Sequence, residues 1–106
     1  KLEHITTFFS MLYNHRLALA VDKVRLQSGA NILEFNLFDY FSDIENNYQE
    51  YGFTNTDDAC IYVFSQNGAF NPECDLSTFV FFDEIHPTTA VHQRAGAALY
   101  HALVGE

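Results

Sequence analysis

The chain has 106 residues and a mass of 12.1 kDa, which is enough for one domain at most. Hydrophobic residues make up 48% and aromatic residues 16%, a composition that excludes a disordered or low-complexity segment. The net charge of −9 argues against a nucleic-acid partner, because phosphate binding needs clustered Lys and Arg. No apolar run reaches the roughly 20 residues of a transmembrane segment, and no signal-peptide pattern follows Lys1.

The acidic residues are unevenly distributed. No Lys or Arg occurs between Leu26 and Gln93, whereas eleven Asp and Glu residues lie between Glu34 and Glu84. The sequence contains no spaced Asp-x-Asp-x-Asp-Gly loop of the kind that binds calcium, so we interpret this stretch as a solvated acidic surface.

The two cysteines, Cys60 and Cys74, are separated by thirteen residues. This spacing fits neither a CxxC redox motif nor a four-ligand zinc site. We therefore predict a disulfide, which would place the protein in an oxidising compartment; two free buried thiols are the alternative.

The first half of the chain predicts a helix, a turn and a strand. Residues 6–27 predict one amphipathic helix, because apolar residues recur there at helical spacing, and Gly29 is suited to the left-handed position that ends a helix. The stripe consists of Ile5, Phe9, Tyr13, Leu17, Ala20, Val21 and Val24. Residues 31–37 are mostly apolar and predict a strand. A helix, a glycine turn and an apolar strand in succession indicate an α/β unit with a parallel sheet.

The second half predicts a short helix over residues 39–46, with Phe38, Phe41 and Ile44 on its buried side. Residues 48–73 show little periodicity, and we expect an irregular segment that the two cysteines would hold. Residues 79–82 predict a short strand. A last helix begins just after Pro87, where Thr88 or Thr89 can cap it. Its apolar stripe is Val91, Ala95, Ala98, Leu99, Ala102 and Leu103.

Asp83 and His86 stand three residues apart between the predicted strand and the last helix. A general base needs an imidazole held in one tautomer, and a carboxylate on the other ring nitrogen provides this. By spacing alone, a capping Asp and a surface His are the simpler interpretation. A metal set that adds His92 lacks a further ligand at suitable spacing. Glu84 should point away from Asp83, because adjacent residues of an extended turn face opposite ways.

The segment Phe82-Asp83-Glu84-Ile85-His86-Pro87-Thr88-Thr89 resembles the last block of the GDSL, or SGNH, lipases and esterases. That block is an Asp-x-x-His-Pro-Thr element between an aromatic strand and the C-terminal helix. Residues 13–14, 31–38, 51–55 and 59–60 also resemble earlier parts of such proteins, in the same order. The likeness is greatest to the bacterial phospholipase, lysophospholipase and acyltransferase branch.

The resemblance implies that residues 1–106 are the C-terminal segment of one SGNH hydrolase domain, an α/β/α three-layer, flavodoxin-like sandwich. His86 would be the general base and Asp83 its orienting carboxylate, with no metal and no cofactor. None of the serines lies in a Gly-Asp-Ser or Gly-x-Ser-x-Gly element. These serines are Ser10, Ser28, Ser42, Ser65 and Ser77. We therefore expect the nucleophile on a partner, the N-terminal fragment of the same enzyme, and expect no activity from this chain alone.

The resemblance further implies a secreted or periplasmic serine ester hydrolase that acts on lipid or lysophospholipid esters. The aromatic residues between the cysteines, among them Tyr62, Phe64 and Phe70, would form an acyl-chain wall or a packed cluster under a loop. Two alternatives stay open: a noncatalytic binding or regulatory domain of the same fold, and a carbohydrate acetylesterase. The substrate-binding residues and the choice between hydrolysis and acyl transfer are not determined by this sequence.

Overall fold

The computed structural model describes residues 2–105, with side chains from His4 onward. Its elements, in chain order, are α1 (Leu2–Ser28), α2 (Leu37–Asn46), β1 (Asn55–Ala59), β2 (Ile61–Tyr62), β3 (Ala69–Phe70), β4 (Phe79–Phe81) and α3 (Thr89–Val104). The chain divides into two compact units, residues 1–34 and 35–106. Mixed helices and small sheets of this kind are compatible with part of an α/β domain.

The first unit is built on α1, which confirms the helix predicted over residues 6–27 and extends it by one turn at its start. Gly29 has a φ of 68° and its N–H donates to the Arg25 carbonyl at 3.0 Å, so it ends the helix as expected. The predicted stripe is not buried: Ile5, Phe9 and Leu17 are all exposed. No helix in the described part of the chain is both long and apolar enough to cross a membrane.

The strand predicted over residues 31–37 is wrong. Residues 29–36 have no regular structure, and Leu37 begins α2. The Asn36 side chain accepts a hydrogen bond from the Asp39 N–H at 3.0 Å, which satisfies a free donor of the first helical turn. An apolar run becomes a strand only when a neighbouring strand satisfies its backbone, and no described strand pairs with this one.

The second unit holds two small sheets. β1 and β4 pair in parallel, with Asn55 opposite Phe79 and Ala59 opposite Phe81. β2 and β3 form an antiparallel hairpin. The parallel pairing expected of an α/β unit is therefore present, but between other strands than predicted. The expectation of an irregular segment over residues 48–73 is confirmed only in part, because the three short strands β1, β2 and β3 lie within it. The strand predicted over residues 79–82 is confirmed as β4.

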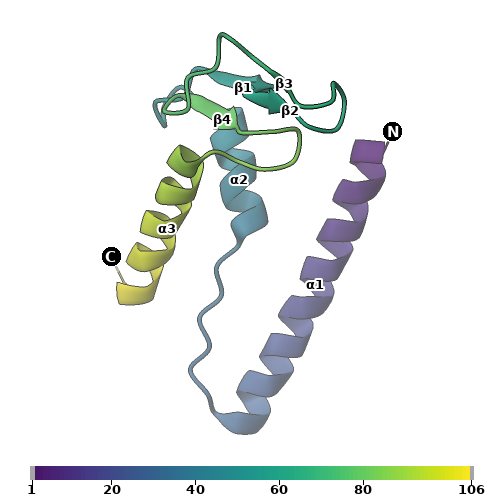
Figure 1. Ribbon diagram of the computed structural model, residues 1–106. Coiled ribbons are helices and arrows are strands. Elements are labelled where there is room, and N and C mark those ends of the chain that lie inside the picture. The colour runs from purple at the N-terminus through teal and green to yellow at the C-terminus, as the bar shows by residue number, and fades with distance from the viewer. Residues whose placement is uncertain (1, 106) are drawn as a thin grey trace. The chain divides into compact units, whose positions relative to one another are not determined.

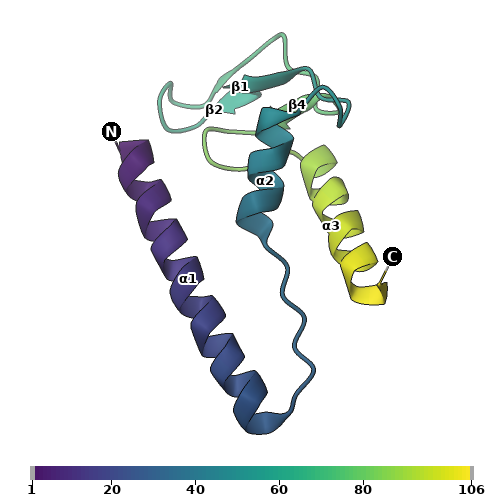
Figure 2. The ribbon, with the colours of Figure 1, turned by 180° about the vertical axis from the view of Figure 1, so that it is seen from behind.

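The core of this unit lies between the parallel strands and two helices. Ile44 from α2, Phe53, Val80 from β4 and Val91 from α3 are buried against one another. In Figure 1, α2 and α3 extend from the same side of β1 and β4, and the view from behind in Figure 2 agrees. The short helix predicted over residues 39–46 is confirmed, with Ile44 as its buried residue.

The last helix begins one residue after Thr88, as predicted, but Thr88 does not cap it with its side chain. The hydroxyl instead donates to the Phe79 carbonyl at 2.8 Å, and the Thr88 N–H donates to the Val80 carbonyl at 2.9 Å. Both bonds tie the start of α3 to β4. Of the predicted apolar stripe of this helix, Val91 is buried, whereas Leu99 and Leu103 are exposed.

A first prediction concerns this buried hydroxyl. Thr88 is 1% exposed, so Thr88→Val keeps the shape but leaves the Phe79 carbonyl without its donor. We expect the free energy of unfolding to fall by about 1–3 kcal/mol, measured by urea denaturation. Thr89→Val, on the exposed neighbour, is the matched control and should change stability little. Equal effects of the two substitutions would contradict this assignment.

A second prediction concerns the disulfide. Cys60 and Cys74 are joined, as the sequence predicted, and close a loop around the β2–β3 hairpin. In the chain-entropy model a loop of about 15 residues contributes roughly 3 kcal/mol, so a reductant should lower the free energy of unfolding by about this amount. The double variant Cys60→Ser with Cys74→Ser should show the lower stability with and without reductant. A wild-type free energy of unfolding that a reductant does not change would refute the prediction.

Candidate active site

The chain makes a tight turn between β4 and α3, and Asp83 and His86 lie on this turn. The Phe82 N–H donates to the His86 carbonyl at 2.8 Å, and Phe81 forms an antiparallel bridge with Pro87. Pro87 keeps His86 out of helical conformation, and Thr88 then returns the chain to β4. The backbone is thus fixed on both sides of the two candidate residues.

The Asp83 carboxylate is the centre of the turn. Its side chain is 8% exposed. Oδ1 accepts the N–H of Ile85 at 2.9 Å and the N–H of His86 at 2.7 Å. The imidazole Nδ1 of His86 lies 2.9 Å from Oδ2 and 3.0 Å from Oδ1. The two residues singled out by sequence therefore form a directly hydrogen-bonded pair.

Several influences set the charge of Asp83. Burial raises the pKa of this carboxyl. Hydrogen bonds from the N–H of Ile85 and from the ring and N–H of His86, together with the charge of His86, lower the pKa by more than burial raises it. The net result is an Asp83 pKa below the ordinary value, so this side chain is an anion near neutral pH. An ionised carboxylate can only accept hydrogen bonds.

This charge fixes the tautomer of His86. Because Asp83 can only accept, Nδ1 of the neutral ring carries the proton, and the Nε2 atom keeps its lone pair. The His86 side chain is 63% exposed, in contrast to its buried partner. A buried, ionised carboxylate that holds an accessible imidazole with Nε2 unprotonated is the arrangement of a general base.

Glu84 has a separate set of partners. Its carboxylate accepts the N–H of Phe64 at 3.0 Å and the N–H of Ser65 at 2.7 Å, both in the connection from β2 to β3. Asp83 and Glu84 thus point apart, as the sequence predicted. The role of Glu84 in tying the hairpin to the turn was not predicted, because its partners are backbone groups about twenty residues away that leave no signal in the sequence.

The other side chains weighed in the sequence lie elsewhere. His92 is exposed on α3, and the described residues contain no group of three or more His, Cys, Asp and Glu that could hold a metal ion. The hydroxyls of Ser28 and Ser77 bond to the Val24 carbonyl and to Asp75. A cavity of about 360 Å³ lies beside α3, lined in part by Tyr51, Ser77 and Arg94, outside the Asp83–His86 turn.

Comparison with known proteins gives the same family resemblance as the sequence motif. No protein-family model matches the chain. It is similar to a GDSL esterase/lipase of Arabidopsis thaliana, 33% identical over 94 residues, which cover 82% of this chain and 26% of that protein. A second one from the same plant is 31% identical over 98 residues, 86% of this chain and 27% of that protein. The thermolabile hemolysin of Vibrio parahaemolyticus is 33% identical over 75 residues, 61% of this chain and 18% of that protein.

An Asp–His pair at the end of a parallel strand is a site typical of α/β hydrolytic enzymes. With these matches, the chain is a distant relative of the GDSL esterases and lipases. It spans about a quarter of the length of the Arabidopsis relatives that it matches.

A third prediction follows from the lowered pKa of Asp83. The unfolded carboxyl holds its proton up to the ordinary pKa of 3.8, whereas the folded one releases it at lower pH. The stabilisation is therefore fully present above 3.8 and is lost as the pH falls through the folded value. Acid titration followed by the Asp83 carboxyl carbon signal should give a midpoint below 3.8. Asp83→Asn should remove this part of the acid sensitivity of unfolding; an unchanged acid profile would contradict the assignment.

Proposed function

We propose that this chain supplies the general base and its orienting carboxylate to a serine ester hydrolase. The observation that supports the proposal is the pair itself: Nδ1 of His86 bonded to the buried carboxylate of Asp83. The similarity to proteins described as GDSL esterases and lipases supports the same chemistry.

In the proposed reaction, Nε2 of His86 takes the proton from a serine hydroxyl as its oxygen attacks the ester carbonyl. The new C–O bond gives a tetrahedral intermediate. His86 then returns the proton to the leaving alcohol as the ester bond breaks, and an acyl-serine remains. Water, or an alcohol in an acyl transfer, then gives its proton to Nε2 as its oxygen forms a bond to the acyl carbon. The serine ester bond breaks, and His86 returns the proton to the serine oxygen. Asp83 stabilises the imidazolium in both stages while staying ionised.

The nucleophile, in this proposal, comes from a separate segment of the same protein. The described hydrogen bonds of the His86 ring are to Asp83, and the curated Arabidopsis relatives are about four times as long as the matched segment. The chain would then form the C-terminal part of an SGNH-type three-layer domain, and the rest of that domain would be its partner. On its own the chain would not hydrolyse esters.

We further propose lipid or lysophospholipid acyl esters as the substrates and an extracytoplasmic location. Exposed apolar side chains on the turn, such as Phe82 and Ile85, favour a substrate with an apolar portion. One bacterial relative is named a hemolysin, which fits action on a membrane. The Cys60–Cys74 disulfide fits an oxidising compartment.

A fourth prediction tests the proposed roles in the complete protein, with the serine-bearing segment present. His86→Ala and Asp83→Asn should each lower kcat for short-chain p-nitrophenyl esters by about 10²- to 10⁴-fold, because Nε2 no longer accepts the serine proton. His92→Ala, an exposed histidine of α3, is the matched control and should keep wild-type activity.

A fluorophosphonate probe that labels activated serines separates the enzyme from a noncatalytic domain of the same fold. The wild-type protein should be labelled, and His86→Ala should be labelled far more slowly. Absence of labelling in the wild type would refute the proposal. Release of acetate from acetylated xylan, without activity on lysophosphatidylcholine, would replace the lipid substrate by a carbohydrate one.

A further inference from the structure

The β2–β3 hairpin is attached to the candidate catalytic turn at its base. The N–H groups of Cys60 and Ile61 both donate to the Phe82 carbonyl, at 3.0 and 2.9 Å. The disulfide to Cys74 and the N–H of Asn71, which donates to the Cys60 carbonyl at 2.8 Å, close the hairpin at the same place. The residue that precedes Asp83 therefore carries the base of the hairpin.

The tip of the hairpin has its own attachment, through Glu84. Its carboxylate accepts two backbone N–H groups of the tip, those of Phe64 and Ser65. Burial raises the pKa of Glu84, but the hydrogen bonds from Ser65 and Phe64 lower it below the ordinary value, so the acceptor is charged near neutral pH. Hydrogen bonds to a charged acceptor are roughly twice as strong as neutral ones.

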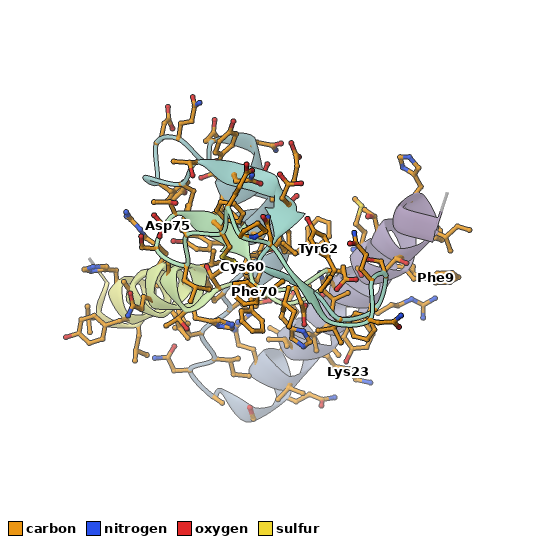
Figure 3. The ribbon with its side chains drawn as sticks, turned by 45° about the horizontal axis from the view of Figure 1, so that its top comes forward. Phe9, Lys23, Cys60, Tyr62, Phe70 and Asp75 are labelled. Carbon is orange, nitrogen blue, oxygen red and sulfur yellow. A yellow bond between two sulfur atoms is a disulfide. The ribbon has the colours of Figure 1, made fainter. Side chains whose placement is uncertain are left out.

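Large apolar side chains stand exposed on both segments that Glu84 connects. On the hairpin these are Phe64 at 64% and Phe70 at 68% exposure. On the turn, Ile85 is 64% exposed and Phe82 is also exposed. Figure 3 shows Tyr62 and Phe70 on the hairpin near Cys60. Ile85 directly precedes His86 in the turn, and the hairpin is joined to the same turn through the Glu84 carboxylate and the Phe82 carbonyl.

We propose that Glu84 is a positioning residue, which fixes the tip of the hairpin so that its apolar side chains hold the acyl chain of the substrate beside His86. This inference rests on the proposed ester hydrolysis and adds the element that would favour long acyl chains. Each methylene buried on such a surface strengthens binding by about fourfold. Without the carboxylate the tip keeps its turn hydrogen bonds but loses its link to the catalytic turn.

The fifth prediction compares Glu84→Ala and Glu84→Gln in the complete protein with the matched controls Glu73→Ala and Glu73→Gln. Glu73 carries the same charge on the same disulfide-closed loop and is exposed. Amide exchange at Phe64 and Ser65 should become about 10-fold faster in Glu84→Ala, whereas Glu84→Gln, which keeps one oxygen acceptor, should lie between it and wild type. The Glu73 variants should exchange as wild type, and the amide of Ile44, which is fully buried within α2, should stay protected in all.

The second measurement is the ratio of kcat/KM for p-nitrophenyl decanoate to that for the butyrate. We expect this ratio to fall about 10-fold in Glu84→Ala through a higher KM for decanoate, with partial recovery in Glu84→Gln and no change in the Glu73 variants. If amide exchange shows that the core of the Glu84→Ala variant is no longer protected, the test rests on the exchange and the kcat/KM ratio of Glu84→Gln. A wild type that hydrolyses neither ester overturns the proposed function, and with it this role. Normal hydrolysis with an unchanged ratio, or unchanged exchange at Phe64 and Ser65, overturns the role of Glu84 alone.

Discussion

The second unit depends on how β4 leads into α3, because the backbone returns on itself within a few residues and stays bonded to the strand that it has just left. Asp83 makes this return possible. One carboxylate oxygen accepts the N–H groups of Ile85 and His86, which the turn would otherwise leave unpaired. Thr88 then closes the turn with two bonds to β4. The bonds that shape the backbone are the same ones that bring the His86 ring to the carboxylate.

The negative charge of Asp83 therefore serves both the backbone of the turn and the protonation of the His86 ring. The backbone N–H groups that fold the turn also lower the pKa of Asp83, which keeps it ionised although it is buried. Its ionisation in turn determines which nitrogen of His86 carries the proton. A substitution at Asp83 changes the turn and the tautomer together, so Asn, which keeps one oxygen acceptor, is more informative than Ala.

The adjacent acids Asp83 and Glu84 have different partners. Asp83 faces the turn and His86, whereas Glu84 faces the hairpin and its backbone N–H groups. The alternation of side chains along an extended segment gives two neighbouring residues access to two different parts of the molecule. In the proposed enzyme, one acid would serve the chemistry and the other the placement of the apolar surface. The disulfide limits how far the hairpin can move when either contact is lost.

The sequence by itself determined the local features: the long first helix with Gly29 at its end, the short helix around Ile44, the strand before Asp83 and the Cys60–Cys74 pairing. These depend on periodicity, turn chemistry and residues close in the chain. The Asp83–His86 pair was expected only through the family resemblance, because spacing alone favoured a capping Asp and a surface His. The tertiary structure decided which segment became a strand. Residues 31–37 have the composition of a strand, but β1, with Asp57 and Asp58, pairs with β4 instead. Strand formation depends on a partner for the backbone rather than on apolar content, and that partner lies about twenty residues away. The contact between Glu84 and the hairpin could not be predicted from the sequence for the same reason, because its partners are also about twenty residues apart in the chain.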